Sequence, residues 1–204
     1  MKNKKLIGVN KFEVINLNNF SKNYYNQITQ ISVENFGGPS AINSEILEEY
    51  RKSPSSIFFT LLDSKNVVGF VGGEIYKKDK IDKVIKSPIS RTFPEIERFG
   101  FLYIISTKKC YGGLGIGKCL ESLFEIEMKK RNVEIIVTPV VLWEKQPQYN
   151  VKMFKSLDYD VYKEIPNYYT EESIKDGWTC PECGGVCHHT IAVMYKNLIN
   201  KKKE

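Results

Sequence analysis

The hydrophobic positions of the chain repeat in two ways, which together predict a mixed α/β protein. Continuous or alternating apolar runs rich in Val, Ile, Phe and Tyr predict strands, and apolar residues three or four positions apart predict helices. The predicted strands cover residues 12–17, 57–62, 67–76, 99–107, 134–142, 159–165 and 190–198, and the predicted helices cover residues 20–36, 44–52, 117–131 and 147–157. The length of 204 residues is typical of one domain, which we expect to span residues 1–204.

Three connecting segments refine this pattern. Residues 63–66 (Asp-Ser-Lys-Asn) are a turn sequence, so the strands on either side are expected to form an antiparallel hairpin. Pro139 interrupts the hydrogen bonding of strand 134–142, marks an edge or a bulge, and can splay two neighbouring strands. Residues 77–95 are charged, contain Pro88 and Pro94, and lack a sustained periodicity, so they predict a loop insertion with room for a helical turn. Loops of that length often border a binding site.

Composition and charge exclude several classes of protein. Hydrophobic residues make up 42% of the chain, as in folded globular proteins, and no run approaches the ~18 apolar residues of a membrane span. The net charge of +6 is spread widely, without the basic stripe and interleaved aromatics of a nucleic-acid-binding surface. The apolar segment near the N-terminus is too short for a secretory signal. We therefore expect a cytoplasmic monomer or homodimer with no membrane or nucleic-acid partner.

A glycine-rich turn between strand 99–107 and helix 117–131 is the clearest candidate binding site. Gly112, Gly113, Gly115 and Gly117 fall within six residues. Backbone N–H groups of such a turn converge on an anion, and the helix that follows adds its positive end, so the turn suits a pyrophosphate. The alternative without a ligand is a turn needed for tight packing of strand against helix.

Two nucleotide-binding alternatives fit this turn less well. Gly112 to Lys118 satisfies G-x-x-x-x-G-K of a nucleotide-triphosphate P-loop, but Cys119 replaces the Ser/Thr and is a poor magnesium ligand. Strand 134–142 also does not end in the aspartate that would hold the metal. A P-loop protein remains a distant alternative. A dinucleotide fingerprint fails, because the last three glycines alternate and no G-x-G-x-x-G can be drawn.

The segment Tyr-Gly-Gly-Leu-Gly-Ile-Gly-Lys-Cys-Leu resembles the acetyl-CoA motif of the GNAT superfamily, R/Q-x-x-G-x-G/A after a strand. Gly115 and Gly117 match this motif, whereas Gly112 stands where the family has a basic or amide residue, so backbone amides, helped by nearby lysines, would hold the phosphates. The element order from residue 12 to 165 also looks like this fold. The resemblance implies a mixed, mostly antiparallel sheet of about seven strands flanked by about four helices. It also implies transfer of acetyl from acetyl-CoA to a primary amine by direct attack.

The resemblance also implies positions for both substrates. Main-chain groups of Ile105 and Thr107 would contact the pantetheine and thioester. The segments 164–169 and 192–198 resemble the ribosomal-protein-alanine branch of N-terminal acetyltransferases, in which Tyr168 and Tyr169 would line the acceptor site. The alternative for this pair is an aromatic cap on a strand end. The acceptor would be a protein N-terminus or a small amine. The turn residues expected to bind the cofactor are Gly112, Gly113, Leu114, Gly115, Ile116, Gly117 and Lys118.

The acid and base of the reaction are less clearly marked. Segment 153–159 resembles the F-Y-x-x-x-G-F of the family, but Phe154 stands at the position of the tyrosine that commonly protonates the departing thiolate. A thiol of pKa ~8.5 can leave unassisted, or Tyr149 can replace the acid. Glu97 and Glu144, which flank predicted strands, are candidate bases, unless they are ordinary surface glutamates. Phe154 and Gly112 also leave open a non-catalytic regulator that binds acyl-CoA.

A cluster of cysteines and histidines near the C-terminus predicts a metal site. Cys180, Cys183 and Cys187 fall within eight residues, next to the two histidines of the chain. Structural zinc takes four thiolate and imidazole ligands, and here the fourth would be His189, or His188, with Cys110 or Cys119 as remote alternatives if the sheet brings them near. A redox dithiol, a haem attachment site and an iron–sulfur site fit the number and spacing of these residues less well. We predict a structural zinc site in an insertion at residues 170–189, between the last two strands, where it can shape the acceptor's entrance.

Overall fold

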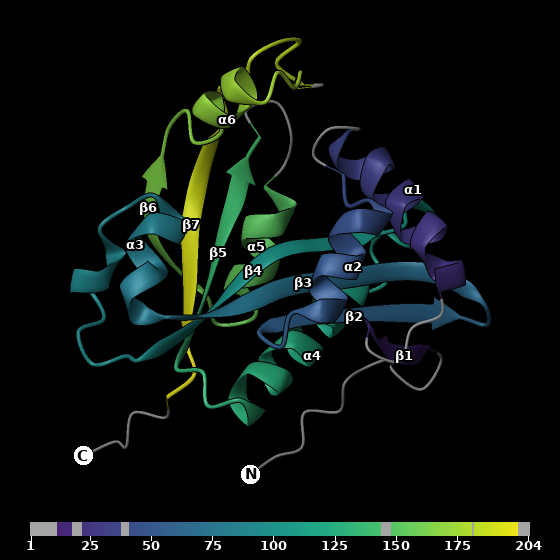
Figure 1. The fold of residues 1–204 in the computed structure, drawn as a ribbon, viewed down its shortest axis with the longest axis horizontal. Helices are drawn as coiled ribbons and strands as arrows, with labels where there is room; N and C mark the ends of the chain where they lie inside the picture. The colour runs from purple at the N-terminus through teal and green to yellow at the C-terminus, as the bar shows by residue number, and fades with distance from the viewer. Residues whose placement is uncertain (1–11, 18–21, 38–40, 144–147, 181, 200–204) are drawn as a thin grey trace.

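The computed structural model describes residues 12–17, 22–37, 41–143, 148–180 and 182–199, whose strands form one seven-stranded sheet (Figure 1). The strand order is β1-β2-β3-β4-β5-β7-β6, and among these pairs only β4 and β5 are parallel. The predicted mixed, mostly antiparallel sheet is confirmed. The strands are β1 (Glu13–Asn16), β2 (Ser56–Asp63), β3 (Asn66–Lys77), β4 (Arg98–Thr107), β5 (Ile135–Leu142), β6 (Asp160–Ile165) and β7 (Thr190–Asn197).

Helices cover both faces of the sheet. Figure 1 shows α1, α2 and α3 in front of the sheet, α4 and α5 behind it, and α6 at the upper end of β6 and β7. The described residues contain six α-helices, where about four were expected, and the two additional ones are the short α3 and α6. The helices are α1 (Tyr25–Phe36), α2 (Ser44–Lys52), α3 (Ile81–Ile85), α4 (Ile116–Lys130), α5 (Tyr149–Lys155) and α6 (Thr170–Lys175). None of them is long and apolar enough to cross a membrane.

The segment predicted as a loop insertion, residues 77–95, folds into α3 between two single 3-10 turns. Ile81, Ile85 and Ile89 are all buried beneath it and pack against the front of β4, β5 and β7. Their four-residue spacing is a helical signal. The charged residues between these isoleucines made the helical pattern hard to recognise, because only one apolar residue per turn of α3 faces the core.

Helix α4 packs closely against the back of the sheet because the strands below it carry glycines. Phe124 and Met128 are fully buried on its inner face, each contributing about 1.5–3 kcal/mol through burial. A Cβ added at Gly73 would lie 2.6 Å from Phe124 Cζ, and one at Gly100 would lie 2.6 Å from Met128 Sδ. Any larger residue at either position would push α4 away from β3 and β4.

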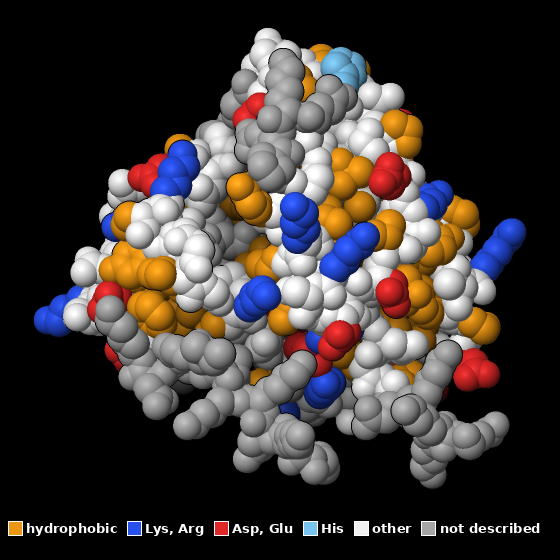
Figure 2. Space-filling view, turned by 180° about the vertical axis from the view of Figure 1, so that it is seen from behind, with side chains coloured by type: hydrophobic (Ala, Val, Ile, Leu, Met, Phe, Trp, Pro, Cys, Tyr) orange, Lys and Arg blue, Asp and Glu red, His pale blue; other side chains and the backbone are white. Residues whose placement is uncertain are grey.

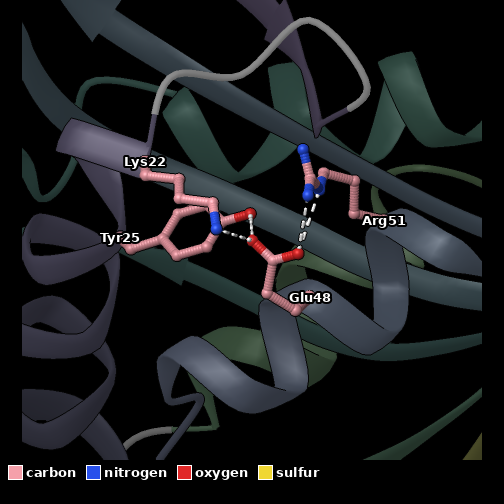
Figure 3. Close-up of polar contacts among 4 residues, drawn as sticks. All are labelled: Lys22, Tyr25, Glu48 and Arg51. Carbon is pink, nitrogen blue, oxygen red and sulfur yellow. Dashed lines mark hydrogen bonds and ion pairs between the residues drawn. The ribbon is translucent and has the colours of Figure 1, made fainter.

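Helices α1 and α2 are joined by a network around one carboxylate (Figure 3). Glu48 Oε1 accepts a hydrogen bond from the Tyr25 hydroxyl at 3.0 Å and pairs with Lys22 Nζ at 3.2 Å. Its other oxygen accepts from Arg51 at 2.7 Å. Burial raises the pKa of Glu48, but the hydrogen bonds from Arg51, Tyr25 and Lys22 outweigh that effect and lower it to about 2. The two helices are thus held as one unit over β2 and β3.

Candidate functional site

Strands β4 and β5 pair over three residues and then separate. The last pair is Phe101 with Val137, whereas β5 stays paired with β7 to its end. Thr138, the next residue of β5, is buried and donates a hydrogen bond from Oγ1 to the carbonyl oxygen of Leu102 at 3.0 Å. Pro139 follows directly, and the predicted splaying of two neighbouring strands is observed between β4 and β5. The predicted bulge at Pro139 is wrong, because β5 pairs with β7 through this residue without a register shift. Beyond it, no strand of the described residues lies beside β4 on its β5 side.

A β-bulge in β4 adjoins the point of separation. Leu102 lies opposite Gly73 and Ile104 lies opposite Gly72, so Tyr103 is an extra residue in β4. Its side chain is 44% exposed. Ile105 and Thr107, whose main chain is expected to contact a cofactor, follow the bulge and pair only with β3. The bulge therefore bends β4 at the point where one edge of its backbone becomes available.

The glycine-rich turn lies directly after this open stretch of β4. Gly113 and Gly115 have φ values of 79° and 78°, in the left-handed region that favours glycine. The segment Gly112–Gly115 is exposed, and nothing lies within 4 Å of a Cβ added at Gly113 or Gly115. These glycines are therefore required by the shape of the turn, and the space around them is open.

The N-terminus of α4 completes an anion-binding geometry. Gly115 caps the helix, and its carbonyl accepts the first helical hydrogen bond, from the N–H of Cys119. The N–H groups of the first turn, residues 116–118, precede that bond and carry the positive end of the helix dipole. No acidic residue occupies the first turn, and Lys118 is exposed beside it. Lys and Arg side chains also gather in the middle of the face that α4 and α5 cover (Figure 2).

Two predicted residues near this turn are placed by α5. A Cβ at Gly117 would lie 2.9 Å from Met153 Sδ, so this glycine lets α5 approach the start of α4. Phe154, at the expected acid position, is only 2% exposed and packs edge-on against Tyr159, with the ring centroids 4.9 Å apart. Tyr149 begins α5 and is 70% exposed. The side chain at the usual acid position thus belongs to the core behind the sheet.

On the opposite face, a chain of hydroxyl groups leads from Tyr103 to a carboxylate. Tyr76 donates a short hydrogen bond to Glu74 Oε2, and Tyr103 and Tyr76 share a second short hydrogen bond between their hydroxyls. Since Tyr76 has one hydroxyl hydrogen and donates it to Glu74, Tyr103 is the donor to Tyr76. The Tyr103 oxygen keeps its lone pairs for another donor.

Glu74 is held by hydroxyl groups and has no ion-pair partner in the described part of the chain. Its Oε1 accepts long hydrogen bonds of 3.3–3.4 Å from Ser53, Ser55 and Ser56. Burial, the hydrogen bond with Glu74 and that with Tyr103 raise the pKa of Tyr76. Burial also raises the pKa of Tyr103, an effect that its hydrogen bond with Tyr76 opposes. Both phenols are therefore protonated near neutral pH.

Tyr168 and Tyr169 lie at the same side of the sheet as this network. Tyr168 is 7% exposed, and burial together with nearby Tyr103 raises its pKa to about 12. The ammonium group of Lys86 lies 4.5 Å from the centre of the Tyr168 ring, and it donates a hydrogen bond to the carbonyl of the same residue at 3.3 Å. Lys86 also pairs with Glu172 of α6. The tyrosine pair thus joins α3, α6 and the front of β4.

The four predicted metal ligands, Cys180, Cys183, Cys187 and His189, lie together between α6 and β7. Their ligand atoms are all within 4.8 Å of one another. His189 Nε2 lies 3.3 Å from Cys180 Sγ and 3.8 Å from Cys183 Sγ. The structure therefore favours His189 over the exposed His188 as the fourth ligand. Cys110 and Cys119 belong to the strand–helix turn and not to this cluster.

The remaining candidates are spread over the molecule. Glu97 precedes β4 at the end opposite the glycine turn, where it lines an open groove with Arg98 and Glu134. Its main-chain N–H donates to the Glu134 carboxylate at 3.0 Å. The structure thus does not bring Glu97 together with the other candidates. Glu144 lies outside the described residues.

The hydroxyl network around Glu74 was not expected from the sequence. Glu74 and Tyr76 lie in a strand that reads as mostly apolar, and Tyr103 lies in one that reads as fully buried. Glu74 and Tyr76 lie two positions apart in β3, and Tyr103 lies on the neighbouring strand β4, so the three side chains share one face of the sheet. The signal that could have revealed this network is Glu74, a charged residue within an otherwise mostly apolar strand.

Comparisons with known proteins concern the fold. No protein-family model matches the sequence, and no curated protein matches it either. Among solved structures, the chain is similar to the ribosomal-protein-S18-alanine N-acetyltransferase from Escherichia coli, with a TM-score of 0.63, 11% identity, and 95% of this chain and 98% of that chain covered. It is also similar to Arabidopsis thaliana NAA60 in complex with acetyl-CoA, with a TM-score of 0.69, 12% identity, and 92% and 98% covered.

A third match is Arabidopsis thaliana Naa50 in complex with a bisubstrate analogue, with a TM-score of 0.61, 14% identity, and 92% and 99% covered. These matches cover more than nine-tenths of the chain. The sheet order, the break beside the bulge and the three structural matches together show that the chain has the GNAT acetyltransferase fold.

Proposed function

We propose that the protein is an N-acetyltransferase that transfers acetyl from acetyl-CoA to a primary amine. The observation that carries this proposal is the open edge of β4 after Phe101, which leads directly into the exposed glycine turn at the start of α4. An extended backbone edge can hydrogen-bond the amides of a pantetheine arm in the way that it would bond a strand. The turn and the helix N-terminus suit a pyrophosphate.

The residues present fit the cosubstrate through backbone groups. Gly112 offers no side-chain contact, so the N–H groups of the turn and of the first turn of α4 would hold the phosphates, with Lys118 beside them. When bound, acetyl-CoA supplies an activated thioester. The P-loop alternative is not retained, because β3 runs antiparallel to β4 and the thiol of Cys119 is half-buried, where burial raises its pKa.

The acceptor amine would approach from the front of the sheet, where Tyr103 is exposed beside the bulge. An ammonium group donates to the free lone pair of the Tyr103 oxygen. As that proton moves onto Tyr103, the hydroxyl proton of Tyr103 passes to Tyr76 and that of Tyr76 passes to Glu74. Each phenol oxygen gives up one proton and receives one, and the neutral amine left behind can attack the thioester carbon. The new N–C bond replaces the C–S bond, coenzyme A leaves as the thiolate, and the thiolate takes up the second amine proton, which nitrogen releases as the amide forms. Glu74 serves here as the final proton acceptor.

The acceptor that we propose first is a protein N-terminus, and a small amine is the second choice. Two structural matches, at low sequence identity, are a ribosomal-protein-S18-alanine N-acetyltransferase and Naa50 in complex with a bisubstrate analogue. Tyr168 and Tyr169 would line this acceptor site. The exposed ring of Tyr103, which is linked through Tyr76 to the Glu74 carboxylate, suits a cationic group.

Calorimetric titration with acetyl-CoA and separately with ATP and magnesium tests the binding half of the proposal. We expect acetyl-CoA to bind and ATP not to bind. Release of free thiol on adding N-terminal peptides and small amines then tests transfer. Binding without turnover on a broad amine panel would favour the regulator, an alternative supported by Phe154 in the core. No binding of acetyl-CoA would overturn the proposal.

We also propose that the Cys180, Cys183, Cys187 and His189 cluster binds a structural zinc ion. Three thiolates and one imidazole match the ligand set of closed, four-coordinate zinc sites, which leave no open position for catalysis. The left-handed Gly184, with a φ of 69°, folds the chain back so that both ends of the cluster face one point. The predicted domain extent, cytoplasmic location and oligomeric state remain predictions.

A further inference from the structure

We infer that zinc in this cluster holds Tyr168 and Tyr169 in position at the proposed acceptor site, so that metal binding controls acceptor affinity and leaves acetyl-CoA binding unchanged. The inference about the acceptor rests on the proposed function. The inference about the position of the tyrosines rests on contacts within the segment between β6 and β7. The zinc ion would therefore act as a positioning element for one of the two substrates.

Two of the four zinc ligands are hydrogen-bonded directly to the segment that carries the tyrosine pair. The carbonyl of His189 accepts a hydrogen bond from the N–H of Tyr168 at 3.1 Å. The carbonyl of Cys187 accepts one from Thr170 Oγ1 at 2.5 Å, and the N–H of Cys187 donates to Ser173 Oγ at 3.1 Å. Movement of either ligand residue would therefore move the backbone on both sides of Tyr169.

Helix α6 provides a second connection between the metal ligands and the tyrosine pair, through Ser173. Ser173, which is buried, also donates from its hydroxyl to the carbonyl of Trp178, two residues before Cys180. Its hydroxyl thus links Trp178 to Cys187, which are the two ends of the segment 178–187 (the metal loop). Trp143, at the end of β5, packs edge-on against His189 with the ring centres 4.8 Å apart. The imidazole is therefore already oriented by an aromatic neighbour.

The tyrosine pair in turn faces the proposed acceptor site. Tyr168 is near enough to Tyr103 for that residue to contribute to its raised pKa. Lys86 of the α3 segment bonds the Tyr168 carbonyl and lies over its ring. The path from the metal to the tyrosine pair thus consists of the hydrogen bond between the Tyr168 N–H and the His189 carbonyl, and Tyr168 in turn interacts electrostatically with Tyr103.

The tip of the metal loop, residues 182–186, buries little apolar surface. These residues are exposed or half-exposed, and in the described part of this loop an isolated bridge between Cys180 and Gly185 is the regular backbone pairing. Burial of apolar side chains cannot offset the entropy of ordering such a segment, which a metal commonly does in small loops. Loss of the ion should therefore loosen the segment from Tyr168 to Cys187.

The test compares two ligand variants with two matched controls. Cys183→Ser removes an exposed ligand, and His189→Gln keeps the backbone carbonyl that bonds Tyr168, so a change at Tyr168 reports loss of the ion. His188→Gln and Cys110→Ser change an exposed histidine and an exposed cysteine outside the cluster. All four proteins are measured for zinc content, for amide hydrogen exchange and for acetyl-CoA binding. Trp143 and Trp178, the two tryptophans of the chain, both adjoin the cluster and report on it by fluorescence.

We expect one zinc per chain in the wild type and in both controls, and loss of stoichiometric zinc in both ligand variants. Amide exchange over residues 166–175 should rise about tenfold or more in those variants, because a tether of the segment is lost. The Michaelis constant for the acceptor should rise about tenfold, because the tyrosines that line the acceptor site lose their fixed position, while the acetyl-CoA dissociation constant stays within about twofold.

Wild-type protein without zinc and with freely reactive thiols would overturn the metal site. Unchanged exchange at Tyr168 and Tyr169 in zinc-free His189→Gln would overturn the positioning role. These two measurements need neither acetyl-CoA nor an acceptor. Failure of acetyl-CoA to bind to the wild type would instead overturn the proposed function, and the result on tyrosine positioning would stand.

Discussion

Thr138 Oγ1 donates a hydrogen bond to the carbonyl oxygen of Leu102 at 3.0 Å, at the point where β4 and β5 stop pairing. The bond satisfies a buried carbonyl that has just lost its neighbouring strand. It also sets how far the two strands can close beyond Phe101. The width of the proposed cofactor opening thus depends on a side chain in addition to Pro139.

Thr138→Val should destabilise the protein by about 1–3 kcal/mol, because the Leu102 carbonyl is left buried without a partner. Thr138→Ser keeps the hydroxyl and is the control, with a smaller loss from the missing methyl group. The free energies of unfolding are compared by urea denaturation. Equal stabilities of the Val and Ser variants would show that the hydrogen bond does not support this junction.

Gly115→Ala should weaken acetyl-CoA binding about tenfold, since the left-handed φ of 78° is strained for alanine and the amides of the turn would move. Gly184→Ala is the matched control, because Gly184 has a similar φ of 69° and equally open space, but lies in the metal loop. Calorimetry measures the dissociation constants. Similar constants for the two variants would mean that the turn does not hold the phosphates.

Tyr103→Phe should lower kcat about 100-fold at neutral pH and leave the acetyl-CoA dissociation constant unchanged, because the chain of proton transfers then has no first member. Glu74→Gln should show a similar loss, since the final proton acceptor is removed. The loss of kcat relative to the wild type should become smaller as the pH rises past about 8, where the α-amino group of a peptide acceptor loses its proton in solution.

Tyr149→Phe is the comparison for this series, because Tyr149 was the sequence-based candidate for the acid and is 70% exposed on α5. We expect it to keep turnover close to that of the wild type. A pH-independent loss in Tyr103→Phe, or a larger loss in Tyr149→Phe, would contradict the route through Glu74. Steady-state rates of thiol release over the pH range decide between these outcomes.

The features that could be predicted from the sequence are those that depend on residues close together along the chain. The strands, the Gly112–Gly117 turn and the cluster from Cys180 to His189 each depend on residues within one segment, where spacing alone determines which groups meet. The break at Pro139 was predictable for the same reason, because a missing N–H is a local property.

The parts that could not be predicted depend on how segments meet. The contact from Tyr103 to Tyr76 requires the register of β3 against β4 and the bulge that adds one residue to β4. Phe154 matches a family position by spacing, but its burial against Tyr159 depends on how α5 packs on the sheet. Ile81 and Ile85 had helical spacing, yet the charged residues around them masked it.

The final prediction concerns Glu121, a buried carboxyl of α4 that the proposed reaction does not use. Tyr159 donates a hydrogen bond to its Oε1 at 2.8 Å, and its Oε2 has no hydrogen-bond partner. Burial, partly offset by nearby Lys196 and by Tyr159, raises its pKa from 4.5 to about 7. The folded protein therefore holds this proton more tightly than the unfolded chain does.

The resulting stabilisation is fully present below pH 4.5 and is lost as the pH rises through about 7. The loss should amount to about 3 kcal/mol. Glu48 acts in the opposite direction and in a separate window, because its pKa of about 2 removes stability only as the pH falls below 4.5. Urea denaturation of the wild type should therefore show falling stability from pH 4.5 to 8, and Glu121→Gln should flatten this slope. An equally steep slope in the variant would assign the pH dependence to other groups.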